Sequence, residues 1–503
     1  MDYWYPAGNS YDNNIEAEVE EVGKSEKSGS PKEEEKKKEI GEIILKSVKS
    51  QKIRIEVETK RIIAILGAGE SGVGAAYLAQ QQGYDVFVSD FGAIADNYKK
   101  QLQGWNIRFE ENQHTEAEIL NAAEVIKSPG IPEKAAIIKK LREKGTSVIS
   151  EIEFAGRYTD AKIIGITGSN GKTTTTTLTY EILKHAGLNV GLAGNIGQSF
   201  AYQVATEKFD IYVLELSSFM LDDMYKFRVN IAILLNITPD HLDRYDYKME
   251  DYAASKFRIS QNQTADDVFI YCADDPETIK GMAGRSFAVQ LFPFSIEKTV
   301  EQGAFLDQDN IVINIHQEHF TMSIHDLALQ GKHNLYNSMA SGIAAKYLEI
   351  RNPVLRESMS SIKPIEHRME SVAVISGISF INDSKATNVN STWYALESMT
   401  SDVILILGGV DKGNDYTMLR SLVKQKVKAI VCLGKDNKRI HDAFEDVVEV
   451  IVNTHSAQEA ATISYHLATK GDTVLLSPAC ASFDLFKNYE DRGRQFKQAV
   501  KEL

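Results

Sequence analysis

The feature that most constrains the fold is a glycine-rich turn at residues 165–174, Gly-Ile-Thr-Gly-Ser-Asn-Gly-Lys-Thr-Thr. The apolar run 162–167 predicts a buried strand before it, and residues 175–185 predict a helix after it. Such a loop cradles nucleotide phosphates, because its N–H groups and the helix N-terminus both attract anions. We therefore expect Lys172 to reach the β- and γ-phosphates and the Thr173 hydroxyl to hold Mg²⁺.

One position departs from the general phosphate-loop pattern. That pattern has glycine five residues before Gly171, where this chain has Ile166. The alternative interpretation is a tight turn that only caps a buried strand. A Gly-Lys-Thr-Thr run at a strand-to-helix turn nevertheless favours phosphate binding.

Length, charge and cysteine content restrict the class of protein. A chain of 503 residues is too long for one core, so it predicts two to four domains. The net charge of -14 argues against binding to nucleic acid. Cys272, Cys432 and Cys480 fit no disulfide or zinc spacing, and no apolar run approaches the roughly 20 residues of a membrane span. With no signal-peptide pattern, we expect a cytoplasmic protein.

A second glycine-rich turn, Gly-Ala-Gly-Glu-Ser-Gly at 67–72, follows a strand pattern at 62–66. A helical pattern continues to Gln82, and Asp90 follows the strand pattern 84–89. This arrangement fits the dinucleotide-binding fingerprint and alone favours a nicotinamide or flavin enzyme. The residues themselves establish only a phosphate or diphosphate site at a helix N-terminus, and a glycine turn needed for packing is the alternative.

Strand and helix patterns alternate along most of the chain, which indicates an α/β fold with mostly parallel sheets. Residues 1–60 are rich in Glu and Lys and predict a charged, flexible extension. We predict a Rossmann-like domain at 61–152, a central P-loop ATPase-like domain with a parallel sheet at 153–363, and a Rossmann-like C-terminal domain at 364–503.

Two further motifs follow strand patterns of the central block. Glu215 ends the strand pattern 210–215, and His241 follows the pattern 231–236. We expect them on adjacent strand ends near Thr173, where they could hold a divalent metal. Taken singly, each could instead be a buried hydrogen-bonding group, and their joint placement favours the metal.

At this point the chain resembles the Mur ligases of bacterial peptidoglycan synthesis, over about residues 61–503, and among them the members that add D-glutamate. The phosphate loop, Asp-His and His-Arg motifs are typical of the whole family, and three other motifs point to the D-glutamate branch. The motifs that carry the resemblance lie at 167–173, 215–219, 240–245, 331–334, 367–368, 382–388, 408–412 and 477–482.

The resemblance implies an ATP-dependent amide ligase. The L-alanyl carboxylate of UDP-N-acetylmuramoyl-L-alanine would attack the γ-phosphate of ATP to give an acyl phosphate, and the amine of D-glutamate would then displace phosphate. Such a reaction needs positioning and charge neutralisation. Addition of L-alanine, diaminopimelate or lysine is one alternative. A nucleotide-dependent oxidoreductase or a silent nucleotide-binding protein is another.

The resemblance also implies the residues at the ATP end. It implies two Mg²⁺ ions, one held by Thr173 and Glu215 and the second by Glu215, His241 and a carbamylated Lys256. The catalytic residues would be Lys172, Glu215, His241 and Lys256. The ATP-binding residues would be Gly168, Ser169, Asn170, Gly171, Lys172, Thr173, Thr174, Asn334, Arg368 and Asp383.

Two further sets of residues are implied for the other substrates, in a protein expected to be a monomer. The UDP-substrate would bind to Gly69, Glu70, Ser71, Asp90, Phe91 and Asn195. D-Glutamate would bind to Lys385, Thr387, Lys412, Ser482, Phe483 and Tyr489. Cations and hydroxyls suit a substrate with two carboxylates. Tyr489 stands where the family pattern has Phe.

Overall fold

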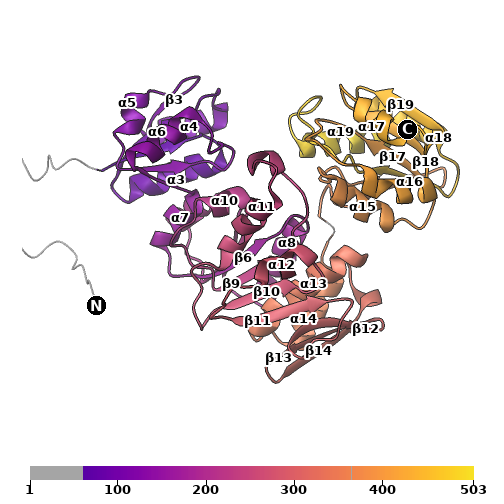
Figure 1. Cartoon of the computed structure of the whole chain (residues 1–503), viewed down its shortest axis with the longest axis horizontal. Coiled ribbons are helices and arrows are strands. Elements are labelled where there is room, and N and C mark those ends of the chain that lie inside the picture. Colours follow the sequence, from indigo (N-terminus) through magenta and orange to yellow (C-terminus); the bar gives the residue numbers. More distant parts are fainter. Residues whose placement is uncertain (1–60, 364) are drawn as a thin grey trace, which may run out of the picture. The chain divides into compact units, whose positions relative to one another are not determined.

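The computed structural model describes residues 61–363 and 365–503, whose strands form three sheets (Figure 1). The charged extension predicted at 1–60 lies outside these residues. Helices pack on the sheets, so the predicted α/β class is confirmed. Within the described ranges, every helix is too short or too polar to cross a bilayer.

The first sheet contains five parallel strands in the order β3-β2-β1-β4-β5. Its strands are β1 (Ile62–Leu66), β2 (Asp85–Ser89), β3 (Arg108–Glu110), β4 (Glu124–Lys127) and β5 (Ser147–Ile149). Its helices are α3 (Glu70–Gln81), α4 (Asp96–Gly104), α5 (Glu116–Leu120) and α6 (Ala136–Lys144). The chain then passes through α7 (Glu151–Ala155) and the 3-10 turn η1 (Gly156–Tyr158) to the second sheet.

The second sheet has nine strands in the order β14-β13-β12-β11-β10-β9-β6-β8-β7, and β13 runs antiparallel to both of its neighbours, β12 and β14. Its strands are β6 (Lys162–Thr167), β7 (Val190–Gly194), β8 (Ile211–Glu215), β9 (Ile231–Leu234), β10 (Val268–Cys272), β11 (Gln290–Ser295), β12 (Gly303–Asp307), β13 (Asn310–Ile315) and β14 (Glu318–Ser323). The accompanying helices are α8 (Lys172–His185), α9 (Phe200–Thr206), α10 (Ser218–Asp222), α11 (Met249–Phe257), α12 (Pro276–Met282), α13 (Lys332–Tyr347) and α14 (Asn352–Ser361). Short 3-10 turns are η2 (Leu242–Arg244), η3 (Arg258–Ser260) and η4 (Ile324–Asp326).

The third sheet has six strands in the order β15-β16-β20-β17-β18-β19, of which only the edge strand β15 is antiparallel. The strands are β15 (Glu370–Ile375), β16 (Ile378–Asn382), β17 (Val403–Leu407), β18 (Val427–Leu433), β19 (Val450–Thr454) and β20 (Thr473–Leu476). The helical elements are α15 (Val389–Glu397), η5 (Thr417–Leu419), α16 (Arg420–Lys426), α17 (Lys438–Phe444), α18 (Ala457–Leu467) and α19 (Tyr489–Lys501).

The apolar strand runs are explained by cores on both faces of each sheet. On β6, Ile163 packs into one core while Ile164 and Ile166 pack into the other. On β17, Leu405 and Ile406 divide in the same way. Because neighbouring side chains on a strand point to opposite faces, a strand covered on both faces needs apolar residues throughout.

Candidate active site

The phosphate loop joins the buried end of β6 to helix α8. Gly171 has φ 82°, a backbone conformation that favours glycine. A β-carbon there would lie 2.5 Å from Asn337 Oδ1, so the loop packs tightly against α13. The helix begins at Lys172, three residues earlier than the predicted 175. The Lys-Thr pair is therefore the first helical turn, and among the described residues no side chain caps it.

Lys172 lies over the loop that precedes it. Its ammonium donates hydrogen bonds to Gly168 O at 2.8 Å and to Ser169 O at 2.9 Å. Burial lowers the pKa of Lys172, while Glu215 and Asp240 act in the opposite direction. A cation therefore lies at the mouth of the phosphate loop, close to two carboxylates.

Glu215 is a buried carboxylate with one free oxygen. Its Oε1 accepts a hydrogen bond from Asn195 Nδ2 at 2.8 Å. Its Oε2 is buried and has no hydrogen-bond partner within residues 61–363 and 365–503. Burial alone would raise its pKa, but the ammonium groups of Lys385 and Lys172 lower it overall. An ionised carboxylate with an unused oxygen is suited to a metal ligand.

His241 reaches the same region from the other side of β6. The expectation of adjacent strands is wrong, because β8 and β9 pair with opposite edges of β6. The phosphate loop thus leaves the sheet between the strands that lead to Glu215 and His241. His241 Nδ1 is 3.5 Å from Lys412 Nζ, and Nε2 is 3.6 Å from Asp240 Oδ1. Burial lowers the pKa of His241, which favours the neutral imidazole that metals bind.

Lys256 is a buried lysine on α11. Its side chain is 1% exposed, and Nζ donates to Gly168 O at 2.9 Å, the carbonyl that Lys172 also contacts. The Nζ atom lies 4.4 Å from the centre of the Tyr252 ring. Burial, followed by the charge of Lys172, places the pKa of Lys256 well below its ordinary value. A neutral amine is the form that reacts with electrophiles.

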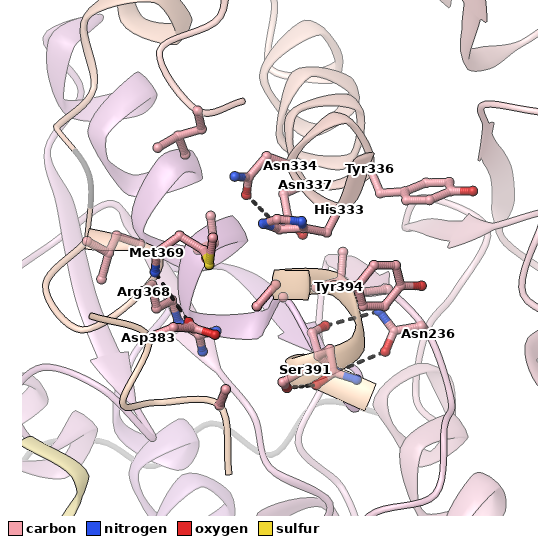
Figure 2. Close-up of a pocket in the computed structure, with 18 residues that line it drawn as sticks. Asn236, His333, Asn334, Tyr336, Asn337, Arg368, Met369, Asp383, Ser391 and Tyr394 are labelled. Atoms are coloured by element: carbon pink, nitrogen blue, oxygen red, sulfur yellow. Dashed lines mark hydrogen bonds between the residues drawn. The ribbon is translucent and has the colours of Figure 1, made fainter. Parts of the chain in front are cut away.

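A pocket of about 100 Å³ lies beside the phosphate loop, lined by α13 and by residues of the third sheet's loops (Figure 2). Figure 2 shows His333, Asn334 and Asn337 along one helix, facing Ser391 and Tyr394. The predicted ATP-binding residues that line it are Asn170, Gly171, Thr174, Asn334, Arg368 and Asp383. The others, Gly168, Ser169, Lys172 and Thr173, lie along the loop next to it.

The sequence analysis missed several residues of this pocket. Asn337 donates to Asn334 Oδ1 at 3.1 Å and accepts from Thr175 Oγ1, also at 3.1 Å. His333 is also missed, and burial lowers its pKa to about 4. The signal that could have found Asn337 is its three-residue spacing from Asn334, which places both on one helix face.

Asp383 is buried at the other side of the pocket. Its carboxyl accepts hydrogen bonds from Ser477 Oγ at 2.9 Å and from the Met369 backbone N–H at 3.3 Å. Burial raises the pKa of Asp383 to about 7. The guanidinium of Arg368 is close enough to counter this shift. The pocket therefore presents a cation and a buried carboxyl side by side.

A second, larger pocket of about 1010 Å³ lies at the carboxyl ends of the first sheet's strands. It is lined by all six residues predicted for the UDP-substrate: Gly69, Glu70, Ser71, Asp90, Phe91 and Asn195. The turn beside it needs glycine, because a β-carbon at Gly72 would lie 1.9 Å from Gly67 O. The structure therefore brings this set of residues together.

The two carboxylates in this set, Asp90 and Glu70, accept hydrogen bonds from protein groups. Asp90 accepts from the backbone N–H groups of Ala68 at 2.7 Å and Gly92 at 2.8 Å. Glu70 accepts from Tyr98 Oη at 2.9 Å and from the Ser199 N–H at 3.2 Å. Both shape the pocket wall through these bonds.

An aromatic pair lies at the rim of the same pocket. Phe91 is 75% exposed, and its ring centre is 5.6 Å from that of His114. His114 also lines the pocket, and the sequence analysis missed it. Its imidazole Nδ1 is 2.6 Å from Ser89 Oγ, at the end of β2.

The residues predicted for D-glutamate meet in pairs. Lys385 Nζ lies 5.0 Å from the centre of the Tyr489 ring, and Lys412 approaches His241. The bridge between Val410 and Ala481 brings the loop of Lys412 beside the buried Ser482. In the part of the chain that the structure describes, Phe483 and Thr387 form no side-chain hydrogen bond or ring contact with these pairs. The Phe483 side chain is 72% exposed.

Residues of the third sheet reach the phosphate loop directly. Lys385 Nζ donates to Thr173 Oγ1 at 2.8 Å, and Ser391 Oγ donates to Asn170 Oδ1 at 2.7 Å. Burial and the nearby Arg368 lower the pKa of Lys385 to about 7. The loop that carries Lys385 therefore completes the site that β6 and α8 begin.

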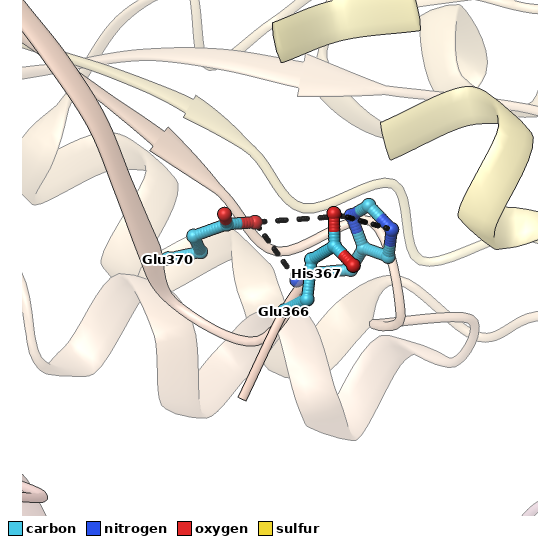
Figure 3. Close-up of side chains that lie close together, drawn as sticks. All are labelled: Glu366, His367 and Glu370. Carbon is cyan, nitrogen blue, oxygen red and sulfur yellow. Dashed lines mark hydrogen bonds and ion pairs between the residues drawn. The ribbon is translucent and has the colours of Figure 1, made fainter. Parts of the chain in front are cut away.

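A separate cluster, Glu366, His367 and Glu370, has the composition of a metal site (Figure 3). Lys497 Nζ, however, lies 2.9 Å from Glu366 Oε1 and 2.6 Å from Glu370 Oε1. Its ammonium forms an ion pair with each carboxylate, so we interpret this cluster as a structural ion-pair network.

Three family models match consecutive parts of the chain. They are the MurD N-terminal domain at residues 62–137, the Mur ligase middle domain at 166–345 and the Mur ligase glutamate ligase domain at 367–480. These three matches follow one another on the parts of the chain that form the three sheets. The chain belongs to the Mur ligase family.

Close relatives narrow the comparison to one branch of that family. The chain is 57% identical over 441 residues to the UDP-N-acetylmuramoylalanine–D-glutamate ligase of Christiangramia forsetii, covering 88% of this chain and 99% of the relative. It is 58% identical over 448 residues to the ligase of the same name from Bacteroides fragilis, covering 88% and 100%. The resemblance inferred from the motifs is therefore confirmed.

Solved structures show the same fold at low sequence identity. UDP-N-acetylmuramate-alanine ligase MurC from Thermotoga maritima has a TM-score of 0.58 at 17% identity, covering 88% of this chain and 99% of that one. MurF from Acinetobacter baumannii has a TM-score of 0.57 at 14% identity, covering 87% and 93%.

Proposed function

We propose that this protein is an ATP-dependent amide ligase that joins D-glutamate to UDP-N-acetylmuramoyl-L-alanine, a cytoplasmic step of peptidoglycan precursor synthesis. The relatives that carry the D-glutamate ligase name match 88% of this chain at 57 and 58% identity. One structural observation supports this function above the others. The large pocket reaches Asn195, whose amide donates to Glu215, and the Glu215 carboxylate lies close to Lys172 at the uncapped start of α8.

Asn195 joins the two halves of the proposed reaction. It lines the large pocket, and its amide donates to Glu215 Oε1 at 2.8 Å. A substrate whose diphosphate lies at the glycine turn of α3 would extend toward Asn195 with its peptide end. Its carboxylate would then approach the phosphate loop, as attack on a γ-phosphate requires.

The proposed ATP site has its phosphates at the first turn of α8 and its base and ribose in the smaller pocket. Lys172 would move from the loop carbonyls to the β- and γ-phosphates, and Arg368 would add a second cation. At about 100 Å³ the pocket is smaller than the roughly 300–1,000 Å³ of small-molecule sites, so side chains or loops must move to admit a nucleotide.

The residues around the phosphate loop fit Mg²⁺, provided that Lys385 releases the Thr173 hydroxyl and that Lys256 is carbamylated. Glu215 offers its free Oε2 and Thr173 its hydroxyl, while Lys385 now donates to that hydroxyl. We propose that Thr173 and Glu215 hold one ion, and that Glu215, His241 and a carbamylated Lys256 hold a second. Bound Mg²⁺ would offset the repulsion between the substrate carboxylate and the triphosphate.

Lys256 fits the proposed modification. Its amine is buried and its pKa is depressed, so it is available to add CO₂ with loss of one proton. The carbamate formed would carry two oxygens in place of an ammonium that cannot bind a cation. The unmodified Lys256 side chain offers no oxygen, which is the ligand atom that Mg²⁺ prefers.

The chemistry then consists of two displacements. A substrate carboxylate oxygen bonds to the γ-phosphorus and ADP leaves, giving an acyl phosphate. The D-glutamate amine next bonds to the acyl carbon, inorganic phosphate leaves and the amine loses a proton. Lys172 and Arg368 would stabilise negative charge on the transferring phosphoryl group.

We further propose that the incoming D-glutamate lies between the phosphate loop and the third sheet, in a protein that acts as a monomer. Lys385, Lys412, Thr387 and Ser482 would bind its carboxylates, with Phe483 and Tyr489 covering it. The inferred domain boundaries are 61–152, 153–363 and 364–503. The three family matches fall inside them, at 62–137, 166–345 and 367–480.

The direct test is release of phosphate in the presence of ATP, Mg²⁺ and UDP-N-acetylmuramoyl-L-alanine while the amino acid is varied. We expect release with D-glutamate and none with L-alanine, diaminopimelate or lysine. Lys172→Ala should abolish turnover and leave the fold intact by circular dichroism. Release only with another amino acid would contradict the proposed substrate, and full activity of Lys172→Ala would contradict the phosphate-loop assignment.

A further inference from the structure

Arg244 connects two loops that the proposed function treats separately. It lies in η2, three residues after His241. Its Nη1 donates to Gly130 O at 3.1 Å, and its Nη2 donates to Pro129 O at 3.2 Å and Ile131 O at 3.3 Å. One guanidinium thus satisfies three successive backbone carbonyls, which the fixed fork of arginine allows and a lysine ammonium does not reproduce.

The carbonyls belong to a loop that forms a wall of the large pocket. Residues 128–132, which follow β4, line this pocket, and Ser128 at their start lies beside Gly67 of the glycine turn before α3. Ile131 O also accepts from Lys127 Nζ at 3.0 Å, so two cations hold this part of the loop. The wall is therefore fixed from outside the first sheet's own hydrogen-bond ladder.

Phe219 links the same guanidinium to His241. The Arg244 guanidinium lies 4.3 Å from the centre of the Phe219 ring. The imidazole of His241 packs against that ring with a centroid separation of 5.2 Å and an interplanar angle of 72°. Phe219 is on α10, four residues after Glu215. A cation–π contact and an edge contact thus join Arg244, Phe219 and His241.

His241 has an unusual backbone conformation that its neighbours must hold in place. His241 has φ 51°, a left-handed conformation that non-glycine residues seldom adopt. Such a backbone persists only when its surroundings hold it, and such residues often lie at functional sites. Phe219 packs against the imidazole, and the Arg244 backbone N–H donates to the His241 carbonyl at 3.0 Å, so both residues help to hold this conformation.

We infer that Arg244 is a positioning residue that couples the filling of the large pocket to the placement of His241. The inference rests on the proposed function, because it assumes that a substrate occupies the pocket and that His241 acts in the reaction. A substrate diphosphate that settles the 128–132 loop would also settle Arg244, and Phe219 would transmit this order to the imidazole. Substrate binding and the chemical site are joined by this arginine.

The experiment compares Arg244→Ala, Arg244→Lys and a control, Arg285→Ala. Arg285 also lies over an aromatic ring, 4.7 Å from the centre of Phe257, and donates to Gly281 O at 2.9 Å. It lines neither pocket. UDP binding by calorimetry, kcat and KM for the UDP-substrate, KM for ATP, and Tm are measured for each.

We expect Arg244→Ala to weaken UDP binding about tenfold and to lower kcat roughly 10- to 100-fold, the effect of losing a group that orients a ligand residue. The KM for ATP should stay near the wild-type value. Arg244→Lys should behave like Arg244→Ala. The control should keep wild-type UDP binding and kcat even where its Tm falls.

A double-mutant cycle tests the route through His241. In a His241→Gln background, Arg244→Ala should lower kcat by less than about threefold further, because residues that act as a unit are not additive. A full additional loss, or a fall in Tm with unchanged UDP binding and kcat, would overturn the inference. A wild-type protein without D-glutamate-dependent turnover would instead contradict the proposed function, and UDP binding would still be measurable.

Discussion

Two lysines share one carbonyl at the centre of the candidate site. Lys172 Nζ and Lys256 Nζ donate to Gly168 O at 2.8 and 2.9 Å. Two ammonium groups on one acceptor repel each other, and burial disfavours both charges. Burial lowers the pKa of both lysines, and the charge of Lys172 lowers that of Lys256 further. Conversion of Lys256 to a carbamate would replace this repulsion with attraction.

Lys256→Ala tests this interpretation at the residue scale. It should lower kcat by more than the roughly 10- to 100-fold that loss of a metal's outer-shell partner costs. Acetate or another short carboxylate should restore part of the activity, because it supplies the missing oxygen ligand. The same carboxylate should not raise the activity of Lys172→Ala, which is the matched control. Wild-type rates in the unrescued Lys256→Ala protein would contradict the role.

At the scale of elements, α7 and α9 meet through one buried carboxyl. Glu151, on α7, accepts hydrogen bonds from Ser199 Oγ and from the Ala201 N–H at the start of α9. Its Oε2 has no hydrogen-bond partner in the described parts of the chain. Burial raises the pKa of Glu151 to about 7, from an ordinary value of 4.5. The contact between the two helices is therefore made by a carboxyl group whose protonated form is favoured by burial.

This shift predicts how the free energy of unfolding depends on pH. Between the unfolded pKa of 4.5 and the folded value of about 7, the folded protein binds more protons, so stability falls as pH rises through that window. Glu151→Gln keeps an acceptor but removes the titration. Relative to wild type, the free energy of unfolding of this variant should rise by about 3 kcal/mol between pH 4 and pH 8. Denaturant midpoints measured at both pH values check this, and an equal difference at both would contradict it.

Strands and helices could be predicted from the sequence where a short run of residues determines them. The strand pattern at 62–66 matches β1, and that at 162–167 matches β6, because both strands are apolar throughout. The pairing of strands is not local. The sequence placed Glu215 and His241 on neighbouring strands, whereas β6 lies between β8 and β9.

The same difference between local and long-range information applies to the site residues. Motif residues at the two glycine turns lie where expected, since a turn's chemistry is encoded within a few residues. Asn337, His333 and His114 were missed, because their roles depend on which helix or loop faces each pocket. The carboxylates of Asp90 and Glu70, which were predicted to bind the ligand, line the pocket and accept hydrogen bonds from protein groups.

At the scale of the whole molecule, three sheets contribute to one proposed reaction path. The first provides the large pocket, the second the phosphate loop with Glu215 and His241, and the third Lys385 and Arg368. Contacts join them, through the Glu70 carboxylate and the Ser199 N–H between the first and second sheets, and through Lys385 and Thr173 between the second and third. The central claim is that this path delivers a peptide carboxylate to the γ-phosphate of ATP.

The most direct test follows an oxygen atom. UDP-N-acetylmuramoyl-L-alanine labelled with heavy oxygen in its alanyl carboxylate is incubated with the enzyme, ATP, Mg²⁺ and D-glutamate, and the released phosphate is analysed by mass spectrometry. An acyl phosphate transfers one labelled oxygen to each phosphate, so the account predicts one label per phosphate released. Amide formation accompanied by unlabelled phosphate would contradict it.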